Sequence, residues 1–160
     1  MKVIIPGSYD PVTVGHLQVI RRAAKEFDEV YAVIFTNPSK SYTFSLDDRT
    51  RMLMLATEEL DNVLVSSSAG LVIDYMREHN IDKIVKGYRT ESDLPWEREQ
   101  AEWNLAHGGY DTELWRCEEE LASVSSTRVR EALAAGDVDE ARKLLDPKVY
   151  EYVTSRLSGR

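Results

Sequence analysis

The chain has 160 residues, a formal net charge of −8 and 42% hydrophobic residues. This length is typical of one domain, so we expect residues 1–160 to form a single domain. The acidic balance argues against a nucleic-acid-binding protein, and no apolar run approaches the roughly 18 residues of a membrane span. The single cysteine, Cys117, excludes an internal disulfide framework, and the chain shows no signal-peptide layout. We therefore expect a cytoplasmic protein without a nucleic-acid or membrane partner.

Short apolar strands alternate with helical patterns along the chain. Strands are expected at Lys2–Ile5, Val30–Phe35, Val63–Val65, Lys83–Val85 and Glu113–Cys117. Helices are expected at about His16–Phe27, Leu46–Leu60, Leu71–His79, Asp93–His107, Thr127–Ala135 and Lys148–Leu157. Gly136 is typical of the residue that follows a helix, and Pro147 of a helix start. This alternation predicts an α/β fold with a doubly wound, parallel, five-stranded sheet, whose ligands bind at the carboxyl ends of the strands.

The turn after the first strand is the most informative segment. It runs from Pro6 to His16 and contains Ser8, Gly7 and Gly15. A helix N-terminus offers unpaired N–H groups and the positive end of a dipole, so a small-residue turn at this place suits a phosphate. The alternative is that His16 is only a polar residue at a helix start.

Three later segments also follow predicted strands. Asn37–Lys40 is typical of a surface turn, but its lysine lies on the ligand side of the sheet. Gly70–Val72 lies at the start of a predicted helix, where ordinary packing of the helix against the sheet is an alternative explanation. Lys86–Asp93 places two cations on either side of Gly87, which suits a phosphate, although a solvated loop has a similar composition.

Ser125-Ser126-Thr127 begins the sixth predicted helix. Serine and threonine commonly cap helices, which is a sufficient structural explanation. The same hydroxyl groups, together with the neighbouring Arg128, also form a possible anion cradle at a helix N-terminus. No cluster of metal-ligating residues with convincing spacing is present in the sequence.

Thr13-Val14-Gly15-His16 resembles the (T/H)xGH motif of nucleotidyltransferases, and threonine at its first position is usual in the phosphopantetheine adenylyltransferases. The later segments resemble that family in the same order. Arg89, Asp93 and Glu97 keep the family spacing, while Lys86 replaces an arginine. The segments Leu94–Trp96 and Trp115–Glu120 also depart from the family pattern, which leaves nucleotide recognition and the acceptor open at these places.

The resemblance implies a Rossmann-like nucleotidyltransferase fold and adenylyl transfer from ATP to 4′-phosphopantetheine. The products would be dephospho-coenzyme A and pyrophosphate, in coenzyme A biosynthesis. It also implies Mg²⁺ bound mainly through the ATP phosphates, without protein metal ligands, and a homo-oligomer, most simply a hexamer.

The resemblance further assigns the site residues. The catalytic residues would be His16, Ser8 and Lys40. The acceptor would be bound by Ser8, Lys40, Leu71, Val72 and Lys86. ATP would be bound by Ser8, Tyr9, His16, Gly87, Tyr88, Arg89, Glu97, Leu121, Ala122, Ser123, Val124, Ser125, Ser126 and Thr127.

Two alternatives remain open on the sequence. One is a nucleotidyltransferase for another phosphorylated acceptor, such as nicotinamide mononucleotide; Thr13 and the Gly70–Val72 pattern argue against it. The other is a non-catalytic nucleotide-binding protein on the same fold. The joint presence of His16, Lys40 and Arg89 argues against that alternative.

Overall fold

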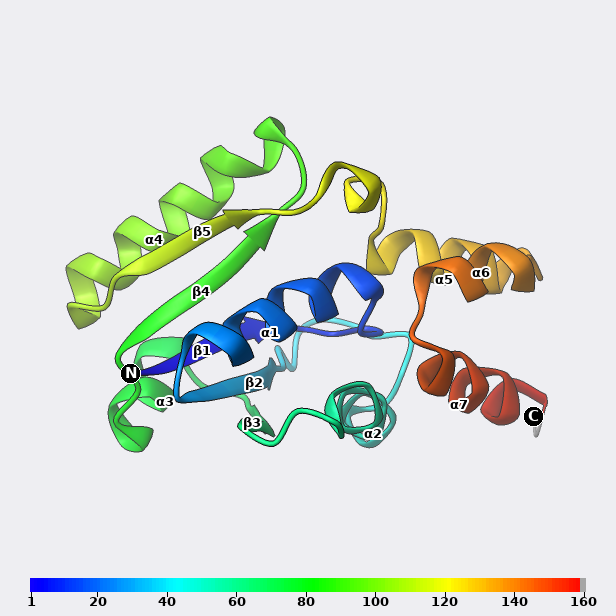
Figure 1. Ribbon diagram of the computed structural model, residues 1–160, viewed down its shortest axis with the longest axis horizontal. Helices are drawn as coiled ribbons and strands as arrows, with labels where there is room; N and C mark the ends of the chain where they lie inside the picture. The colour runs from blue at the N-terminus through cyan, green and yellow to red at the C-terminus, as the bar shows by residue number, and fades with distance from the viewer. Residues whose placement is uncertain (159–160) are drawn as a thin grey trace.

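A computed structural model describes residues 1–158 and the side chains up to residue 156. Its five strands form one parallel sheet in the order β3-β2-β1-β4-β5 (Figure 1). The strands are β1 (Lys2–Gly7), β2 (Glu29–Phe35), β3 (Val63–Ser68), β4 (Lys83–Tyr88) and β5 (Thr112–Arg116). The doubly wound parallel sheet expected from the sequence is therefore confirmed, with β1, β3 and β4 ending two or three residues later than their patterns indicated.

Seven α-helices accompany the sheet in the described part of the chain. They are α1 (Val14–Glu26), α2 (Leu46–Thr57), α3 (Val72–His79), α4 (Leu94–Gly108), α5 (Ser126–Ala134), α6 (Val138–Leu144) and α7 (Pro147–Ser158). Helix α6 was not expected from the sequence. None of the described helices is long and apolar enough to span a membrane.

The strands bury apolar side chains on both faces of the sheet. Alternate residues of β1 divide between two clusters, because successive side chains of a strand point to opposite faces. Val3 and Ile5 pack with residues of α1, α2, α5 and α7, whereas Ile4 packs with residues of α3. Helices therefore cover both faces, as near-continuous apolar strands require.

The strand order determines where a ligand can bind. Strand β1 lies between β2 and β4, and the chain leaves the β1–β2–β3 half of the sheet to cross to β4 on the other side of β1. The carboxyl ends of β1 and β4 therefore flank the point where the strand order reverses, which is the expected ligand crevice of such a sheet. Figure 1 shows α5, α6 and α7 gathered beyond this end of the sheet.

The last helix is held to α2 by a buried carboxylate. Asp48 is 3% exposed and accepts a hydrogen bond of 2.7 Å from the hydroxyl of Tyr152. Its carboxylate also pairs with Arg156 at 2.9 Å. Helix α7 begins at Pro147, as the sequence predicted, because proline needs no backbone donor at a helix start.

Candidate active site

A cavity of about 390 Å³ lies at the carboxyl ends of β1 and β4. It is lined by the end of β1, the start of α1, the end of β4 and the start of α5. The residues around it are Ile5, Pro6, Gly7, Ser8, Tyr9, Thr13, Gly15, His16, Val19, Lys86, Gly87, Tyr88, Arg89, Glu97, Cys117, Leu121, Val124, Ser125, Ser126, Thr127 and Arg130. The structure thus brings together most of the residues that the sequence indicated.

The turn after β1 is fixed by a buried tyrosine and a buried arginine. Tyr9 adopts a positive φ of 47° and is 1% exposed, and its hydroxyl donates to the carbonyl of Ile5 at 2.8 Å. Arg49, which is 3% exposed, donates to the carbonyl of Ser8 at 3.0 Å. The side chain of Tyr9 therefore packs into the core, and its hydroxyl helps to fix the turn.

His16 is held in one orientation by Thr13. The backbone N–H of Thr13 donates to Nδ1 of His16 at 3.0 Å, and the backbone N–H of His16 donates to the Thr13 hydroxyl at 3.4 Å. The two residues form the reciprocal cap of α1. Because Nδ1 accepts from a backbone N–H, the proton of the neutral ring is on Nε2.

The surroundings keep this ring uncharged. Burial, followed by the positive charges of Lys86 and Arg89, lowers the pKa of His16 to about 4. At neutral pH His16 therefore offers a neutral Nε2–H donor, and the positive charge of the cavity comes from its lysine and arginines.

The end of β4 contributes two of these cations. Lys86 pairs with Glu97 at 3.6 Å, and the Arg89 side chain lies 3.9 Å from the carboxylate of Asp93. Between them, Gly87 lies close to α1, because a Cβ at this position would be 2.6 Å from a methyl carbon of Val19. Glycine at this position thus lets the β4 backbone pack directly against α1.

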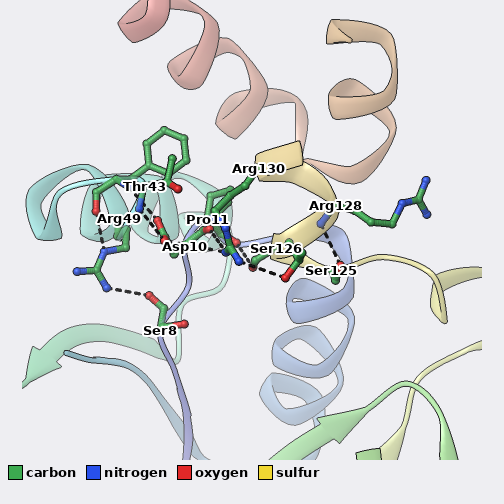
Figure 2. Close-up of polar contacts among 11 residues, drawn as sticks. Ser8, Asp10, Pro11, Thr43, Arg49, Ser125, Ser126, Arg128 and Arg130 are labelled. Atoms are coloured by element: carbon green, nitrogen blue, oxygen red, sulfur yellow. Dashed lines mark hydrogen bonds and ion pairs between the residues drawn. The ribbon is translucent and has the colours of Figure 1, made fainter. Parts of the chain in front are cut away.

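The start of α5 contributes the third cation, and it corrects one inference from the sequence. Arg128 does not join the anion cradle: it donates to the carbonyl of Ser123 at 2.9 Å and pairs with Glu140 of α6. Arg130 lines the cavity instead, and Figure 2 shows the two arginines on different sides of the helix start. The sequence contained a signal for Arg130, because it lies four residues after Ser126 and so shares its helix face.

Ser125 caps α5 by accepting from the N–H of Arg128 at 3.1 Å, which is the structural role that serine commonly has. Ser126 donates to the carbonyl of Pro11 at 2.7 Å (Figure 2). The hydroxyl run therefore serves the fold, and Ser125, Ser126 and Thr127 all line the cavity as well.

Five residues assigned from the sequence are not among those that line the cavity: Lys40, Leu71, Val72, Ala122 and Ser123. Lys40 is exposed on the loop between β2 and α2, and Leu71 is 51% exposed at the cap of α3. Val72 packs on the edge of the smaller apolar cluster. Lys40 follows β2, whereas Leu71 and Val72 follow β3, and both strands lie on the other side of β1 from β4.

The arrangement suits a ligand with several phosphate groups. Lys86, Arg89 and Arg130 line the same cavity in a chain of net charge −8. Glu97 is the one carboxylate among the described lining residues, and it pairs with Lys86. Among the described residues, no group of three or more His, Cys, Asp or Glu side chains could hold a metal ion. The cavity thus presents donors and positive charge, which match phosphate oxygens.

Comparisons with known proteins agree with this geometry. The family model described as cytidylyltransferase-like matches residues 4–132. The phosphopantetheine adenylyltransferase of Thermobifida fusca (strain YX) is 39% identical, over 99% of this chain and 93% of its own length.

Solved structures also resemble the chain. The nicotinic acid mononucleotide adenylyltransferase of Plasmodium falciparum complexed with NaAD has a TM-score of 0.71 at 17% identity, covering 97% of this chain and 95% of that one. The same enzyme complexed with APC has a TM-score of 0.71 at 16% identity, covering 97% and 94%. At these identities the likeness shows a shared fold.

Proposed function

Because this chain belongs to the cytidylyltransferase-like family, we infer that it is a nucleotidyltransferase, and specifically a phosphopantetheine adenylyltransferase that transfers the adenylyl group of ATP to 4′-phosphopantetheine. The observation that carries this conclusion is the 39% identity to a phosphopantetheine adenylyltransferase over 99% of the chain. The cavity supports it independently, since a neutral imidazole donor and three cations surround one space at the switch point of the sheet.

The reaction joins two phosphates. An oxygen of the 4′-phosphopantetheine phosphate attacks the α-phosphorus of ATP, and the bond from that phosphorus to the bridging oxygen of the β-phosphate breaks. The products are dephospho-coenzyme A and pyrophosphate. The attacking phosphate is already an anion, so the protein needs no general base. Catalysis consists of positioning the two substrates and stabilising the charge that develops on the α-phosphoryl oxygens.

We assign the main transition-state contact to His16. Its Nε2–H is held in place through Nδ1, and the low pKa keeps the ring in the tautomer that donates. A preorganised donor that needs no reorientation is effective where charge develops. Ser8, which follows β1 and lines the same cavity, would supply a second donor.

The cations divide between the substrates. Lys86 and Lys40 would hold the acceptor phosphate. Arg89, Arg130 and the Ser125–Thr127 segment would hold the triphosphate, with Glu97 and the Leu121–Val124 segment near the nucleoside. Leu71 and Val72 would meet the pantetheine arm, which would then approach from the side of β2 and β3.

Magnesium would enter with ATP. Among the described residues that line the cavity, Glu97 is the one carboxylate and it is paired with Lys86, so this donor set does not form a Mg²⁺ site. The ion would be held by phosphate oxygens and water, which suits its preference for retaining several water ligands.

We also propose a cytoplasmic homo-oligomer, a hexamer by family resemblance. Helix α4 supports an interface, because Trp96 is 62% exposed, Trp103 41% and Leu105 51%. Of the residues of α4 only Leu94 is buried, and the exposed Trp96 and Trp103, seven residues apart, share one face of the helix that association would cover. Light scattering at micromolar concentration tests the proposal, and a monomeric mass would contradict it.

The function is tested by measuring pyrophosphate release with Mg²⁺, ATP and a panel of phosphorylated acceptors. We expect turnover with 4′-phosphopantetheine and none with nicotinamide mononucleotide. The His16→Ala protein, purified in parallel, shows whether the activity belongs to this chain. Turnover with nicotinamide mononucleotide alone would assign the chain to a different adenylyltransferase.

A further inference from the structure

Asp10 is a buried carboxylate in the turn between β1 and α1. It is 4% exposed, and its two oxygens accept the backbone N–H groups of Thr43 and Phe44, each at 2.9 Å (Figure 2). Those residues end the 36–45 loop between β2 and α2, which also carries Lys40. Phe44 is buried, and a buried backbone donor requires a partner, so Asp10 fixes the end of this loop.

The same residue also holds a cation of the cavity. Nη1 of Arg130 donates to the backbone carbonyl of Asp10 at 2.8 Å and lies 4.0 Å from Oδ2 of its carboxylate. Nη2 of Arg130 donates to the hydroxyl of Thr127 at 3.1 Å. Asp10 Oδ2 is thus shared between the loop, through Thr43, and Arg130 (Figure 2).

We propose that Asp10 is a positioning residue for both substrates. It holds the 36–45 loop in place for the acceptor and Arg130 in place for the triphosphate. Binding of one substrate therefore also orders the residues that bind the other. The proposal rests on the proposed function, which places Lys40 and Arg130 on different substrates.

Charge explains why a carboxylate is needed at this position. Arg130 shares its cavity with Lys86 and Arg89, and like charges in one cavity repel each other when no phosphate is present. A carboxylate behind Arg130 offsets this repulsion without reaching the ligand, because both of its oxygens are directed at the backbone of the loop. An asparagine would have one oxygen instead of two and would carry no charge.

The first test compares Asp10→Asn with Asp48→Asn, a matched control. Asp48 is equally buried and lies at the start of α2, where its carboxylate contacts Tyr152 and Arg156 of α7 and also Ser45, and none of these three partners lines the cavity. We expect Asp10→Asn to raise KM for ATP and KM for 4′-phosphopantetheine, each about tenfold or more, which is the scale of a lost charge-assisted hydrogen bond. Asp48→Asn should lower Tm and leave both KM values within about twofold of wild type.

The second test asks whether Asp10 acts through Arg130. In an Arg130→Gln background, adding Asp10→Asn should change KM for ATP by less than about threefold, because coupled residues are not additive. In the same Arg130→Gln background, Asp10→Asn should still raise KM for the acceptor, because Asp10 acts on the acceptor by holding the 36–45 loop. Equal, independent effects of the two substitutions on KM for ATP would overturn the proposal, as would Asp10→Asn behaving like Asp48→Asn.

A third measurement needs no variant and decides the matter if Asp10→Asn does not fold. Hydrogen exchange of the Thr43 and Phe44 amides is followed in the wild-type protein with and without Mg²⁺ and the unreactive analogue α,β-methylene-ATP. We expect exchange at both amides to slow several-fold when the analogue engages Arg130. Unchanged exchange with the analogue bound would overturn the proposal. This measurement uses no acceptor. Its result therefore does not depend on whether 4′-phosphopantetheine is the substrate.

Discussion

The backbone N–H of Thr13 donates to Nδ1 of His16 at 3.0 Å, so the cap of α1 also sets the tautomer of the proposed catalytic ring. Threonine and histidine stand at the N-cap and N3 positions, where a capping box usually has glutamate or glutamine as its second member. The spacing of the Thr-x-Gly-His motif is therefore the spacing of a helix cap. One local structure begins the helix and directs Nε2–H away from it.

Substitution of His16 should separate binding from chemistry. We expect His16→Ala to lower kcat by about a hundredfold or more, the scale for losing one transition-state donor, and to leave ATP affinity within a few-fold. His16→Gln, whose amide N–H reaches toward the position of Nε2, should retain more activity than His16→Asn, which mimics Nδ1. Steady-state kinetics and ATP titration measure both quantities. An unchanged kcat in His16→Ala would reduce the residue to a helix cap.

The pH dependence follows from the pKa of about 4 for His16. We expect the Cε1 proton of His16 to titrate near pH 4 by NMR, and kcat to show no inflection from this ring between pH 5 and 8. In the unfolded chain a histidine titrates near 6.5. As the pH falls from about 6.5 to about 4, the unfolded state binds a proton that the folded state does not, so the unfolding free energy falls.

The same titration can be checked on stability. Denaturant unfolding of wild type and His16→Ala across this pH range should show a stronger loss on acidification for wild type. An NMR midpoint above pH 6 would contradict the assignment of a neutral donor.

Lys86 should matter more for the acceptor than for ATP. Removing a charged hydrogen bond costs on the order of 1.5–3 kcal/mol, so Lys86→Ala should raise KM for 4′-phosphopantetheine roughly 10- to 150-fold and KM for ATP far less. Lys86→Arg should retain much of the activity, because arginine donates to phosphate and can also pair with Glu97. Equal losses for both substrates would place Lys86 on the triphosphate instead.

Arg130 and Arg128 form a natural pair of test and control on one helix. Arg130 lines the cavity, whereas Arg128 is held by Ser123 and Glu140. We expect Arg130→Ala to raise KM for ATP about tenfold or more. Arg128→Ala should lower Tm slightly and leave KM for ATP within about twofold. The reverse pattern would restore Arg128 as the anion-binding residue.

The sequence predicted the sheet well because parallel strands are buried on both faces and appear as apolar runs. It missed α6, a seven-residue helix between Gly136 and Pro147. Gly136, with a φ of 73°, was correctly taken as the end of one helix, and Pro147 as the start of the next. The intervening cap, in which Asp137 accepts from the N–H of Glu140 at 3.1 Å, was a readable signal.

The sequence predicted the candidate site less completely than the sheet. A pattern of parallel strands predicts that the loops after the strands lie at one end of the sheet, but it does not predict the order of the strands. Lys40 and Leu71 follow strands, as expected, but β2 and β3 lie on the far side of β1 from β4. The partners of individual arginines depend on helices that pack later in the chain. Arg128 was assigned to the anion cradle because Glu140, its partner on the unexpected helix, had no place in the predicted fold.

The position of β1 has a consequence for how the chain is made. Strand β1 pairs with β2 along Lys2–Gly7, and with β4 through Val3 and Ile4. During synthesis β2 and β3 emerge soon after β1, but β4 emerges only from Lys83 onward. Until then one edge of β1 has no neighbour, and unpaired apolar edges favour association between nascent chains. If synthesis pauses before Lys83, the nascent chain therefore exposes the unpaired edge of β1. We expect chaperones to bind the nascent chain at this stage.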